Sequence, residues 1–318
     1  MRIGIYKDTL ANGRGADVAV LSLAEGLRNR GHDAVVFEKP DLARRVAEPW
    51  DVVVSAGTNE LLDLSGFKLS CPLIQQFHTN PKSQFKRKRI FRNWKIRRAL
   101  RRVSAIQVLS EDFVSQVNGY GVAVAVIGNW SMRPSTVNAF AAEKMILYPA
   151  AFAKIKNHRL LIEAFGILSE EFPDWTLELY GDGPHPAAVP PAVKIFRRGS
   201  LCEAYARCAF LAFPSTDEGF GLVVAEAAMF GKPAVMLHDW IGTVAAGGGL
   251  VTAPTPEAYA EGLRQMMRNA DQCRRMGENA RVFCEKNYSR DIILDKWERF
   301  LTDVVGSVRC NRRAIIVK

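Results

Sequence analysis

Short β-branched runs alternate with helical patterns along the first half of the chain. These runs predict strands at residues 2–6, 34–37, 51–55, 72–77, 104–109 and 124–127. After the first run, apolar residues recur at i, i+3, i+4 and i+7 and Gly31 follows as a stop signal, which predicts a helix over 17–31. Strands that alternate with helices are typical of a parallel sheet covered by helices on both faces.

The second half of the chain repeats this plan. It predicts strands at 145–149, 175–181, 193–196, 209–214, 233–237 and 249–252, and helices at 157–172, 222–230, 256–269 and 290–305. The fold class is therefore α/β, with two Rossmann-like, doubly wound parallel-sheet domains facing a cleft, where such sheets usually bind ligands. We expect domains at 1–135 and 136–290, joined by a linker within the polar stretch 129–144. The C-terminal helix within 291–318 is expected to pack back on the first domain.

The most informative segment is residues 213–233, FPSTDEGFGLVVAEAAMFGKP. An apolar strand ends at Pro214, a polar turn with two glycines follows, and a helix then runs to Phe230, just before Gly231. Glycines in front of a helix let an anion approach backbone N–H groups that have no partner within the helix, and the helix dipole favours negative charge there. The pattern therefore predicts a phosphate-binding turn.

Two glutamates, Glu218 and Glu226, flank this turn eight residues apart. On one helix they would stand about 12 Å apart, because each residue adds about 1.5 Å. A carboxylate pair that acts on one glycosidic bond needs roughly 5–9.5 Å, so one ligand held at both ends is the better explanation. The alternative is a structural role, with one charge at the helix N-terminus and the other on a solvated helix face.

The stretch EGFGLVVAE resembles the Glu-x7-Glu motif of family 4 retaining glycosyltransferases, which have the two-domain GT-B fold. The similarity continues in order along the chain through residues 13–37, 126–130, 156–165 and 179–184. It implies transfer of a hexosyl group from a nucleotide sugar, most commonly a UDP-hexose, with retention of configuration and without a metal ion or other cofactor. The implied acceptor is a glycolipid, a lipopolysaccharide or another surface glycan, bound by the N-terminal domain.

The resemblance also implies roles for individual residues. Glu226 would bind the ribose and Glu218 the donor sugar, while Lys156 would neutralise the leaving group. Further donor contacts would come from Gly15, Gly181, Gly219, Phe220, Gly221 and Leu222. The family usually has an arginine where Ala151 stands, and our hypothesis is that Lys154, with Lys156, substitutes for its charge. The alternative is that Lys154 is an ordinary surface residue.

His78 directly follows a predicted strand, where several family members carry a histidine near the donor sugar. A hydrogen bond to a sugar hydroxyl is the role that the resemblance implies, which would make His78 a catalytic residue together with Glu218 and Lys156. The alternative is a loop histidine bonded to backbone. No Asp-x-Asp pair occurs in the sequence, so a carboxylate-bound metal on the diphosphate is not expected. The six cysteines form no CxxC pair, which favours reduced thiols over a zinc site or disulfides.

Basic residues concentrate in the first half of the chain. Of the net charge of +10, residues 1–140 contribute +9, with 21 Lys and Arg against 12 Asp and Glu. Segment 82–102 holds eleven basic residues and no acidic one, interleaved with apolar side chains. It predicts a basic amphipathic helix that contacts an anionic membrane surface or acceptor through Lys86, Arg87, Lys88, Arg89, Arg92, Trp94 and Lys95. The alternative is a helix that packs its apolar stripe on the sheet.

The sequence has no run of 18 apolar residues and no signal-peptide core, so we expect a cytoplasmic protein, peripheral on the inner face of the cell membrane. Two other functions stay open. A nucleotide-sugar epimerase or a phosphorylase would use the same fold. A nucleic-acid-binding protein would explain the basic segment, but it would not explain a charge-neutral second half with a phosphate-binding turn.

Overall fold

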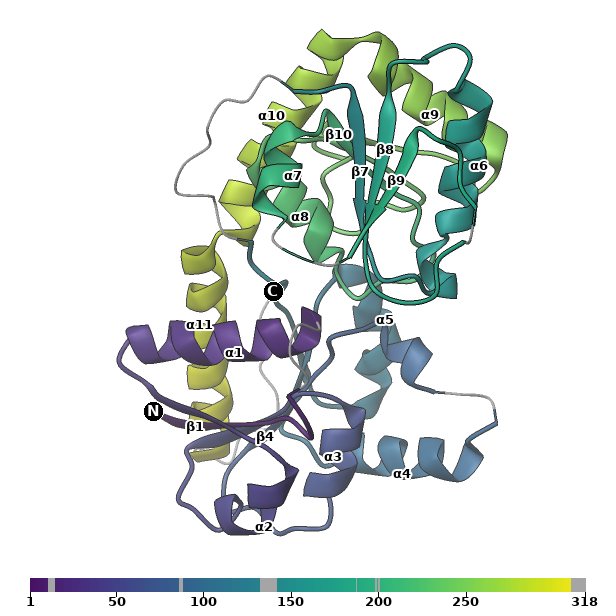
Figure 1. Ribbon diagram of the computed structural model, residues 1–318. Helices are drawn as coiled ribbons and strands as arrows, with labels where there is room; N and C mark the ends of the chain where they lie inside the picture. The colour runs from purple at the N-terminus through teal and green to yellow at the C-terminus, as the bar shows by residue number, and fades with distance from the viewer. Residues whose placement is uncertain are drawn as a thin grey trace. The chain divides into compact units, whose positions relative to one another are not determined.

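The computed structural model describes residues 1–10, 15–85, 88–131, 142–186, 188–197, 199 and 201–309, without the side chains of residues 308 and 309. These residues form two compact units, each taken by itself below (Figure 1). Unit 1 comprises Met1–Asn129 and the C-terminal segment from Arg290, and unit 2 comprises Trp130–Ser289. Most of the predicted linker at 129–144 lies outside the described residues.

Unit 1 is built on a six-stranded sheet in which all neighbours run parallel, in the order β2-β1-β3-β4-β5-β6. Its strands are β1 (Arg2–Tyr6), β2 (Asp33–Phe37), β3 (Val52–Ser55), β4 (Leu73–Gln76), β5 (Ala105–Val108) and β6 (Ala123–Val126). All six strands predicted for this half are confirmed. The central strands β3 and β5 are buried along their whole length, because helices cover both faces of a parallel sheet.

Among the residues that the structure describes, six helices and four short 3-10 turns complete unit 1. They are α1 (Gly15–Asn29), α2 (Leu42–Arg45), α3 (Thr58–Leu64), α4 (Ile90–Leu100), α5 (Val114–Val117), α11 (Arg290–Arg309), η1 (Lys39–Asp41), η2 (Pro81–Gln84), η3 (Glu111–Phe113) and η4 (Asn118–Tyr120). The helix predicted over 17–31 is confirmed as α1. It ends where Gly31 adopts a left-handed φ of 85° and the amide of His32 donates to the carbonyl of Leu27, which satisfies a terminal carbonyl group.

The C-terminal helix α11 packs on α1 within unit 1 (Figure 1). Arg30, just after α1, pairs with Glu298 of α11 at 2.6 Å, and His32 Nε2 lies 2.8 Å from the other oxygen of Glu298. Gly26 leaves space for the side chain of Leu294, because a Cβ at that position would meet its methyl carbons. Charged and apolar contacts therefore both hold α11 on unit 1.

Unit 2 repeats the architecture, with an all-parallel sheet in the order β12-β11-β10-β7-β8-β9. Its strands are β7 (Met145–Pro149), β8 (Thr176–Tyr180), β9 (Val193–Phe196), β10 (Phe210–Phe213), β11 (Ala234–Met236) and β12 (Gly249–Val251). Its helices are α6 (His158–Leu168), α7 (Cys202–Arg207), α8 (Leu222–Met229), α9 (Pro256–Arg268) and α10 (Ala270–Tyr288), with the 3-10 turn η5 (Lys154–Lys156). All six strands predicted for the second half and the helices at 157–172, 222–230, 256–269 and 290–305 are confirmed.

Helix α10, which has 19 residues, is absent from the sequence-based prediction. Its buried positions are Cys273, Gly277, Ala280 and Cys284. They have helical spacing, but they are small and give a weak hydrophobic pattern. Small residues are needed here because the helix runs close to backbone: a Cβ at Gly277 would overlap the carbonyl oxygen of Gly231.

Gly231 follows the end of α8 and its C-cap Phe230, as predicted. It adopts a left-handed φ of 68°, its amide donates to the carbonyl of Ala228, and the amide of Lys232 donates to Ala227 at 3.0 Å. This pair of bonds closes the helix and turns the chain toward β11. Because α10 packs directly on this turn, it fixes the position of the C-terminal end of α8.

Replacing Gly277 by Ala should destabilise unit 2 by about 1–3 kcal/mol, because the added methyl group overpacks the site against the backbone of Gly231. Gly166 in α6 is the matched control, since no atom lies within 4 Å of a Cβ added there. Gly166→Ala should instead stabilise by about 0.5–1 kcal/mol. Urea unfolding followed by circular dichroism compares the two variants. Equal effects of the two substitutions would contradict this packing.

Candidate functional site

The candidate site of unit 2 lies at the carboxyl ends of β7 and β10. These two strands are neighbours at the centre of the sheet: β8 and β9 extend it on the β7 side, and β11 and β12 on the β10 side. The connections after β7 and β10 therefore leave in opposite directions. Such a switch point is where parallel α/β sheets bind their ligands. The loop after β7 carries η5, and the loop after β10 carries the predicted phosphate-binding turn.

A buried tyrosine ties these two loops together. The hydroxyl of Tyr148, in β7, donates to the backbone carbonyl of Lys156 at 2.6 Å and lies 3.1 Å from the hydroxyl of Ser215 in the second loop. Because the tyrosine proton is committed to the carbonyl, Ser215 is the donor in the second bond. The amide of Thr216 adds a bond of 2.9 Å to the carbonyl of Ile155. The loops therefore hold each other in place without a ligand.

The same two loops bring Lys156 and Glu218 together, as an ion pair. Lys156 Nζ lies 2.5 Å from Glu218 Oε1, and the two side chains are 22% and 12% exposed. An ion pair shielded to this extent is screened less by solvent than a surface pair, so both side chains are held in place. Lys154, at the start of η5, is exposed and makes no ion pair with the residues that the structure describes.

Glycines shape the turn in front of α8. Gly221, directly before the helix, has a left-handed φ of 85°, which other residues adopt only at a cost. Gly219 and Phe220 are buried in this turn. The amides of Leu222 and Val223, at the start of α8, have no acceptor within the helix and lie at the positive end of its dipole, whereas the amide of Val224 already donates to the carbonyl of Gly221 at 2.9 Å. Next to the Lys156–Glu218 ion pair, this turn has the features that bind an anion.

Glu226 lies in the second turn of α8. The hydroxyl of Tyr205, a buried residue of α7, donates to Glu226 Oε2 at 2.7 Å and orients the carboxylate. Burial and the neighbouring carboxylate raise the pKa of Tyr205, so the tyrosine keeps the proton that it donates. Glu218 precedes the helix, which begins at Leu222. As the sequence predicts, one carboxylate therefore lies before the helix and the other within it.

The loop after β7 passes very close to the end of β8. A Cβ at Gly181 would overlap the carbonyl oxygen of Ala150, so only glycine fits there. Ala151, the position at which the resemblance leads us to expect arginine, is exposed. After it, Phe152 stacks on His158 with 4.3 Å between the ring centroids, and burial lowers the pKa of His158 to about 4. His158 is thus a neutral packing residue beneath this loop.

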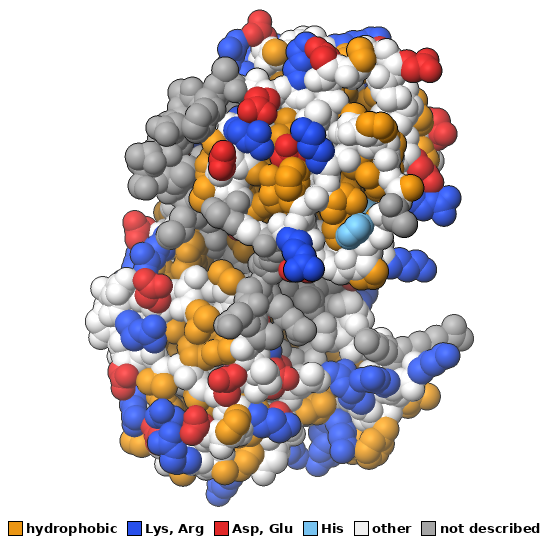
Figure 2. Space-filling view, viewed as in Figure 1, with side chains coloured by type: hydrophobic (Ala, Val, Ile, Leu, Met, Phe, Trp, Pro, Cys, Tyr) orange, Lys and Arg blue, Asp and Glu red, His pale blue; other side chains and the backbone are white. Residues whose placement is uncertain are grey.

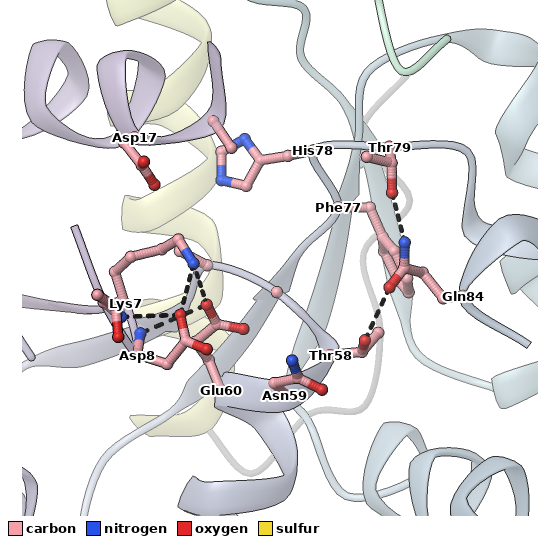
Figure 3. A pocket seen from close by; sticks show the side chains of 14 residues that line it. Lys7, Asp8, Asp17, Thr58, Asn59, Glu60, Phe77, His78, Thr79 and Gln84 are labelled. Atoms are coloured by element: carbon pink, nitrogen blue, oxygen red, sulfur yellow. Dashed lines mark hydrogen bonds and ion pairs between the residues drawn. The ribbon is translucent and has the colours of Figure 1, made fainter. Parts of the chain in front are cut away.

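His78 and Gly15 belong to unit 1, where a pocket of about 460 Å³ opens at the carboxyl ends of β1, β3 and β4 (Figure 3). His78 follows β4 and lines this pocket. Both ring nitrogens are buried, and no described residue forms a hydrogen bond with either one. Burial, with a smaller contribution from Lys7, lowers the pKa of His78 to about 4. Gly15 is the first residue of α1.

The basic segment 82–102 presents two kinds of apolar side chain. Those buried in the core of unit 1 are Ile96, Ala99 and Leu100, and those exposed are Ile90, Phe91 and Trp94. Lys88, Arg89 and Lys95 are exposed, whereas Lys86 and Arg87 lie outside the described residues. Arg92 instead donates to Asn59 Oδ1 at 2.7 Å and to Thr58 Oγ1 at 3.3 Å, at the rim of the pocket. In the view of Figure 2, basic side chains gather on the lower part of the molecule.

Several residues of these sites were not singled out from the sequence. Lys7, Asp8 and Glu60 line the pocket, and Tyr148 and Tyr205 orient the side chains of unit 2. The charged residues could have been predicted as site residues, because they follow β1 and β3, whose carboxyl ends meet that of β4 at one edge of the sheet. The tyrosines could not have been identified as site residues from the sequence, since a tyrosine in an apolar run predicts only a core residue.

In the described part of the chain, no three His, Cys, Asp or Glu side chains converge as metal ligands would. No helix among these residues has the length and apolar character needed to cross a bilayer.

Residues 135–283 match the family model described as "Glycosyl transferases group 1". The matched region includes the two loops at the switch point, the Lys156–Glu218 ion pair and α8. Unit 2 contains a glycosyltransferase group 1 domain.

Curated relatives resemble part of the chain. The exopolysaccharide phosphotransferase of Streptomyces coelicolor is 27% identical over 179 residues, which cover 51% of this chain and 19% of that protein. The N-acetyl-alpha-D-glucosaminyl L-malate synthase of Bacillus anthracis is 26% identical over 184 residues, which cover 52% of this chain and 46% of that protein. The chain thus spans less than half the length of either relative.

Solved structures resemble nearly the whole chain. HepE of Anabaena in complex with UDP-glucose superposes with a TM-score of 0.78 at 18% identity, over 95% of this chain and 100% of that chain. Sucrose-phosphate synthase from Thermosynechococcus elongatus gives a TM-score of 0.76 at 14% identity, over 96% of this chain and 99% of that chain. The predicted GT-B fold of two parallel-sheet α/β domains, one of them the glycosyltransferase domain, is confirmed.

Proposed function

We propose that this protein is a retaining glycosyltransferase that moves a hexosyl group from a nucleotide sugar, first of all a UDP-hexose, to a glycolipid, lipopolysaccharide or other surface glycan. The observation that carries the proposal is the Lys156–Glu218 ion pair in front of the α8 amides. It offers a cation and the positive end of a helix to a diphosphate, and a carboxylate to the hydroxyls of a sugar. This site requires no metal ion.

In the proposed reaction, the bond between the anomeric carbon and the diphosphate oxygen breaks, and the acceptor hydroxyl oxygen bonds to the same carbon from the same face. Negative charge grows on the leaving diphosphate, where the α8 amides and Lys156 stabilise it. The proton of the acceptor hydroxyl passes to the departing phosphate oxygen, so no protein base is needed. Glu218 accepts bonds from the sugar hydroxyls, and Glu226, oriented by Tyr205, accepts them from the ribose.

The comparisons support a sugar nucleotide as the donor. HepE, which has the same fold, was solved with UDP-glucose, and the family model matched by unit 2 describes glycosyltransferases. The Streptomyces relative is named a phosphotransferase, and an epimerase or phosphorylase would suit the same fold. Analysis of the products separates these activities, because among them only a glycosyltransferase joins the hexose to an acceptor while releasing the nucleoside diphosphate.

Lys156→Ala should lower kcat/KM for transfer from the nucleotide sugar about 10²–10³-fold, because a preorganised contact to the developing charge is lost. Glu218→Gln should act in the same direction. Lys194→Ala, at an exposed position in β9, is the matched control and should transfer at the wild-type rate. Release of nucleoside diphosphate in the presence of acceptor measures the rates, and thermal unfolding checks that each variant folds.

Lys154→Ala, measured in the same assay, tests whether Lys154 compensates for Ala151. A loss of about tenfold or more would support compensation, since a charge-assisted hydrogen bond contributes roughly 1.5–3 kcal/mol. An unchanged rate would make Lys154 a surface residue. The account of the donor site is contradicted if Lys156→Ala also retains the wild-type rate.

The exposed face of α4 supports an anionic membrane as the surface where the acceptor is met. The face comprises Ile90, Phe91, Trp94, Lys95 and Arg98. Phe91 and Trp94 stack with 6.0 Å between their centroids, Lys95 Nζ lies 4.7 Å from the centre of the Phe91 ring, and Arg98 lies 5.8 Å from that of Trp94. Exposed aromatic rings with cations beside them suit the headgroup region of an anionic bilayer. The proposed location is therefore the inner face of the cell membrane.

Replacing Phe91 and Trp94 by Ser should weaken binding to anionic phosphatidylglycerol vesicles at least about tenfold, because apolar area no longer enters the bilayer. Replacing Lys95 and Arg98 by Ala should weaken the free energy of binding to these vesicles by about 2 kcal/mol, since each cation near the membrane surface contributes about 1 kcal/mol. Phe67→Ser, at another exposed apolar position of unit 1, is the control and should bind normally. Vesicle sedimentation measures binding. Equal binding to neutral and anionic vesicles, or no binding to either, would contradict the proposal. Preferential binding to nucleic acid would instead favour a nucleic-acid-binding protein.

A further inference from the structure

The pocket of unit 1 collects polar groups from the loops after three neighbouring strands. Figure 3 shows its labelled side chains around an open centre, with Lys7, Asp8 and Glu60 at one end and Thr79 and Gln84 at the other. The volume of about 460 Å³ lies within the usual range for small-molecule sites. The pocket is therefore large enough for one ring-sized ligand.

Two side chains of this pocket contain buried polar atoms that have no partner among the described residues. Asp17, in the first turn of α1, is 4% exposed, and its Oδ2 makes no hydrogen bond there. Figure 3 shows its carboxylate pointing from α1 into the pocket, near His78. The two ring nitrogens of His78 are also buried, and neither has a hydrogen-bond partner among the described residues. Because buried polar atoms are costly to leave unpaired, these atoms point to a ligand that bonds to them.

The described lining of the pocket is rich in carboxylates. Its one cation is Lys7, whose Nζ is bound to Glu60 Oε1 at 2.5 Å and to Asp8 Oδ1 at 2.7 Å. Asp17 adds a third carboxylate. A negatively charged ligand would meet these carboxylates without an uncommitted cation in the described lining, and repulsion is strong where little water screens it.

The opposite wall is neutral and already ordered. Gln84 Nε2 donates to Thr79 Oγ1 at 2.6 Å, and Thr58 Oγ1 donates to Gln84 Oε1 at 3.0 Å. Arg92, beside this wall, donates to Thr58, Asn59 and the carbonyl of Gln84, so its charge is committed to neutral oxygens. Hydroxyl and amide groups of this kind can exchange hydrogen bonds with hydroxyl groups of a ligand.

The family resemblance already implies a sugar beside His78. We propose that this pocket selects for an uncharged, hydroxyl-rich ring such as a hexose and against rings that carry a carboxylate or phosphate. Carboxylates accept hydrogen bonds from hydroxyls, and the neutral imidazole of His78 both donates and accepts one. This proposal rests on the proposed function for the origin of the ring, which would be either the sugar of the acceptor or the hexose of the donor.

The charge of the pocket is opposite to that of the surrounding unit. Residues 1–140 contribute +9 of the net charge of +10, and the exposed face of α4 carries Lys95 and Arg98. Selection for a neutral ring is therefore a local property of Asp8, Asp17 and Glu60. A neutral sugar displayed on an anionic membrane surface would satisfy both the pocket and the helix.

The test uses the full-length chain with 13C-labelled histidine, because the protein has five histidines and His78→Gln identifies the resonance of His78. Methyl glucoside, galactoside and mannoside are titrated beside the matching methyl uronides, in which a carboxylate replaces the CH2OH group. At least one neutral glycoside should shift the His78 resonance saturably. Its uronide should bind at least about tenfold more weakly, a difference of about 1.4 kcal/mol.

Asp17→Asn keeps the size of the side chain and removes one charge, so it should reduce this preference at least threefold. Asp41→Asn, in η1 and outside the pocket, is the matched control and should leave the preference unchanged. The proposal is overturned if no neutral glycoside shifts His78 at concentrations up to about 0.1 M, far above a millimolar Kd. Equal affinity for a uronide and its neutral partner would overturn it as well.

UDP-glucose added to a glycoside-saturated sample identifies the source of the ring. Displacement of the glycoside assigns the pocket to the hexose of the donor, and simultaneous binding assigns it to the sugar of the acceptor. UDP binding is measured separately by calorimetry, without any glycoside. If the protein does not bind UDP but a glycoside still shifts the His78 resonance, the proposed donor site is wrong, whereas the proposed selectivity of the pocket is supported.

Discussion

The hydroxyl of Tyr148 holds together the two loops that leave the centre of the unit 2 sheet. It donates to the carbonyl of Lys156 and accepts from Ser215, and burial raises its pKa, so it keeps the proton on which the link depends. Because of this link, Lys156 stands beside Glu218 before a ligand arrives. A diphosphate would therefore meet a cation and helix amides that are already in position, which is the condition for strong electrostatic stabilisation of a leaving group.

In both units, the candidate site lies in loops at the carboxyl ends of parallel strands, but the side chains in these loops differ in their chemistry. In unit 2, the loops at the switch point present a glycine-rich turn and a lysine, which suits an anion. In unit 1, the loops after β1, β3 and β4 present carboxylates around His78, which suits hydroxyl groups. The exposed face of α4 adds a third kind of surface, aromatic and basic. Under the proposed function, phosphate, sugar and membrane recognition would therefore fall to distinct elements of the chain.

The sequence was most informative where the structure follows from local rules. The β-branched runs predicted all twelve strands because buried parallel strands need such residues on both faces, and Gly31 and Gly231 predicted helix ends because left-handed backbone favours glycine. Helix α10 was missed because its buried stripe is built from small residues that fit against backbone. The Tyr148 link and the partnership of Tyr205 with Glu226 were missed because they join residues far apart in the chain.

A crystal structure of the full-length protein with bound UDP tests the central claim most directly. The account predicts diphosphate oxygens at about 2.7–3.2 Å from the amides between Gly219 and Leu222 and from Lys156 Nζ, with the ribose hydroxyls on Glu226. UDP bound elsewhere, or bound with its diphosphate away from the start of α8, would contradict it.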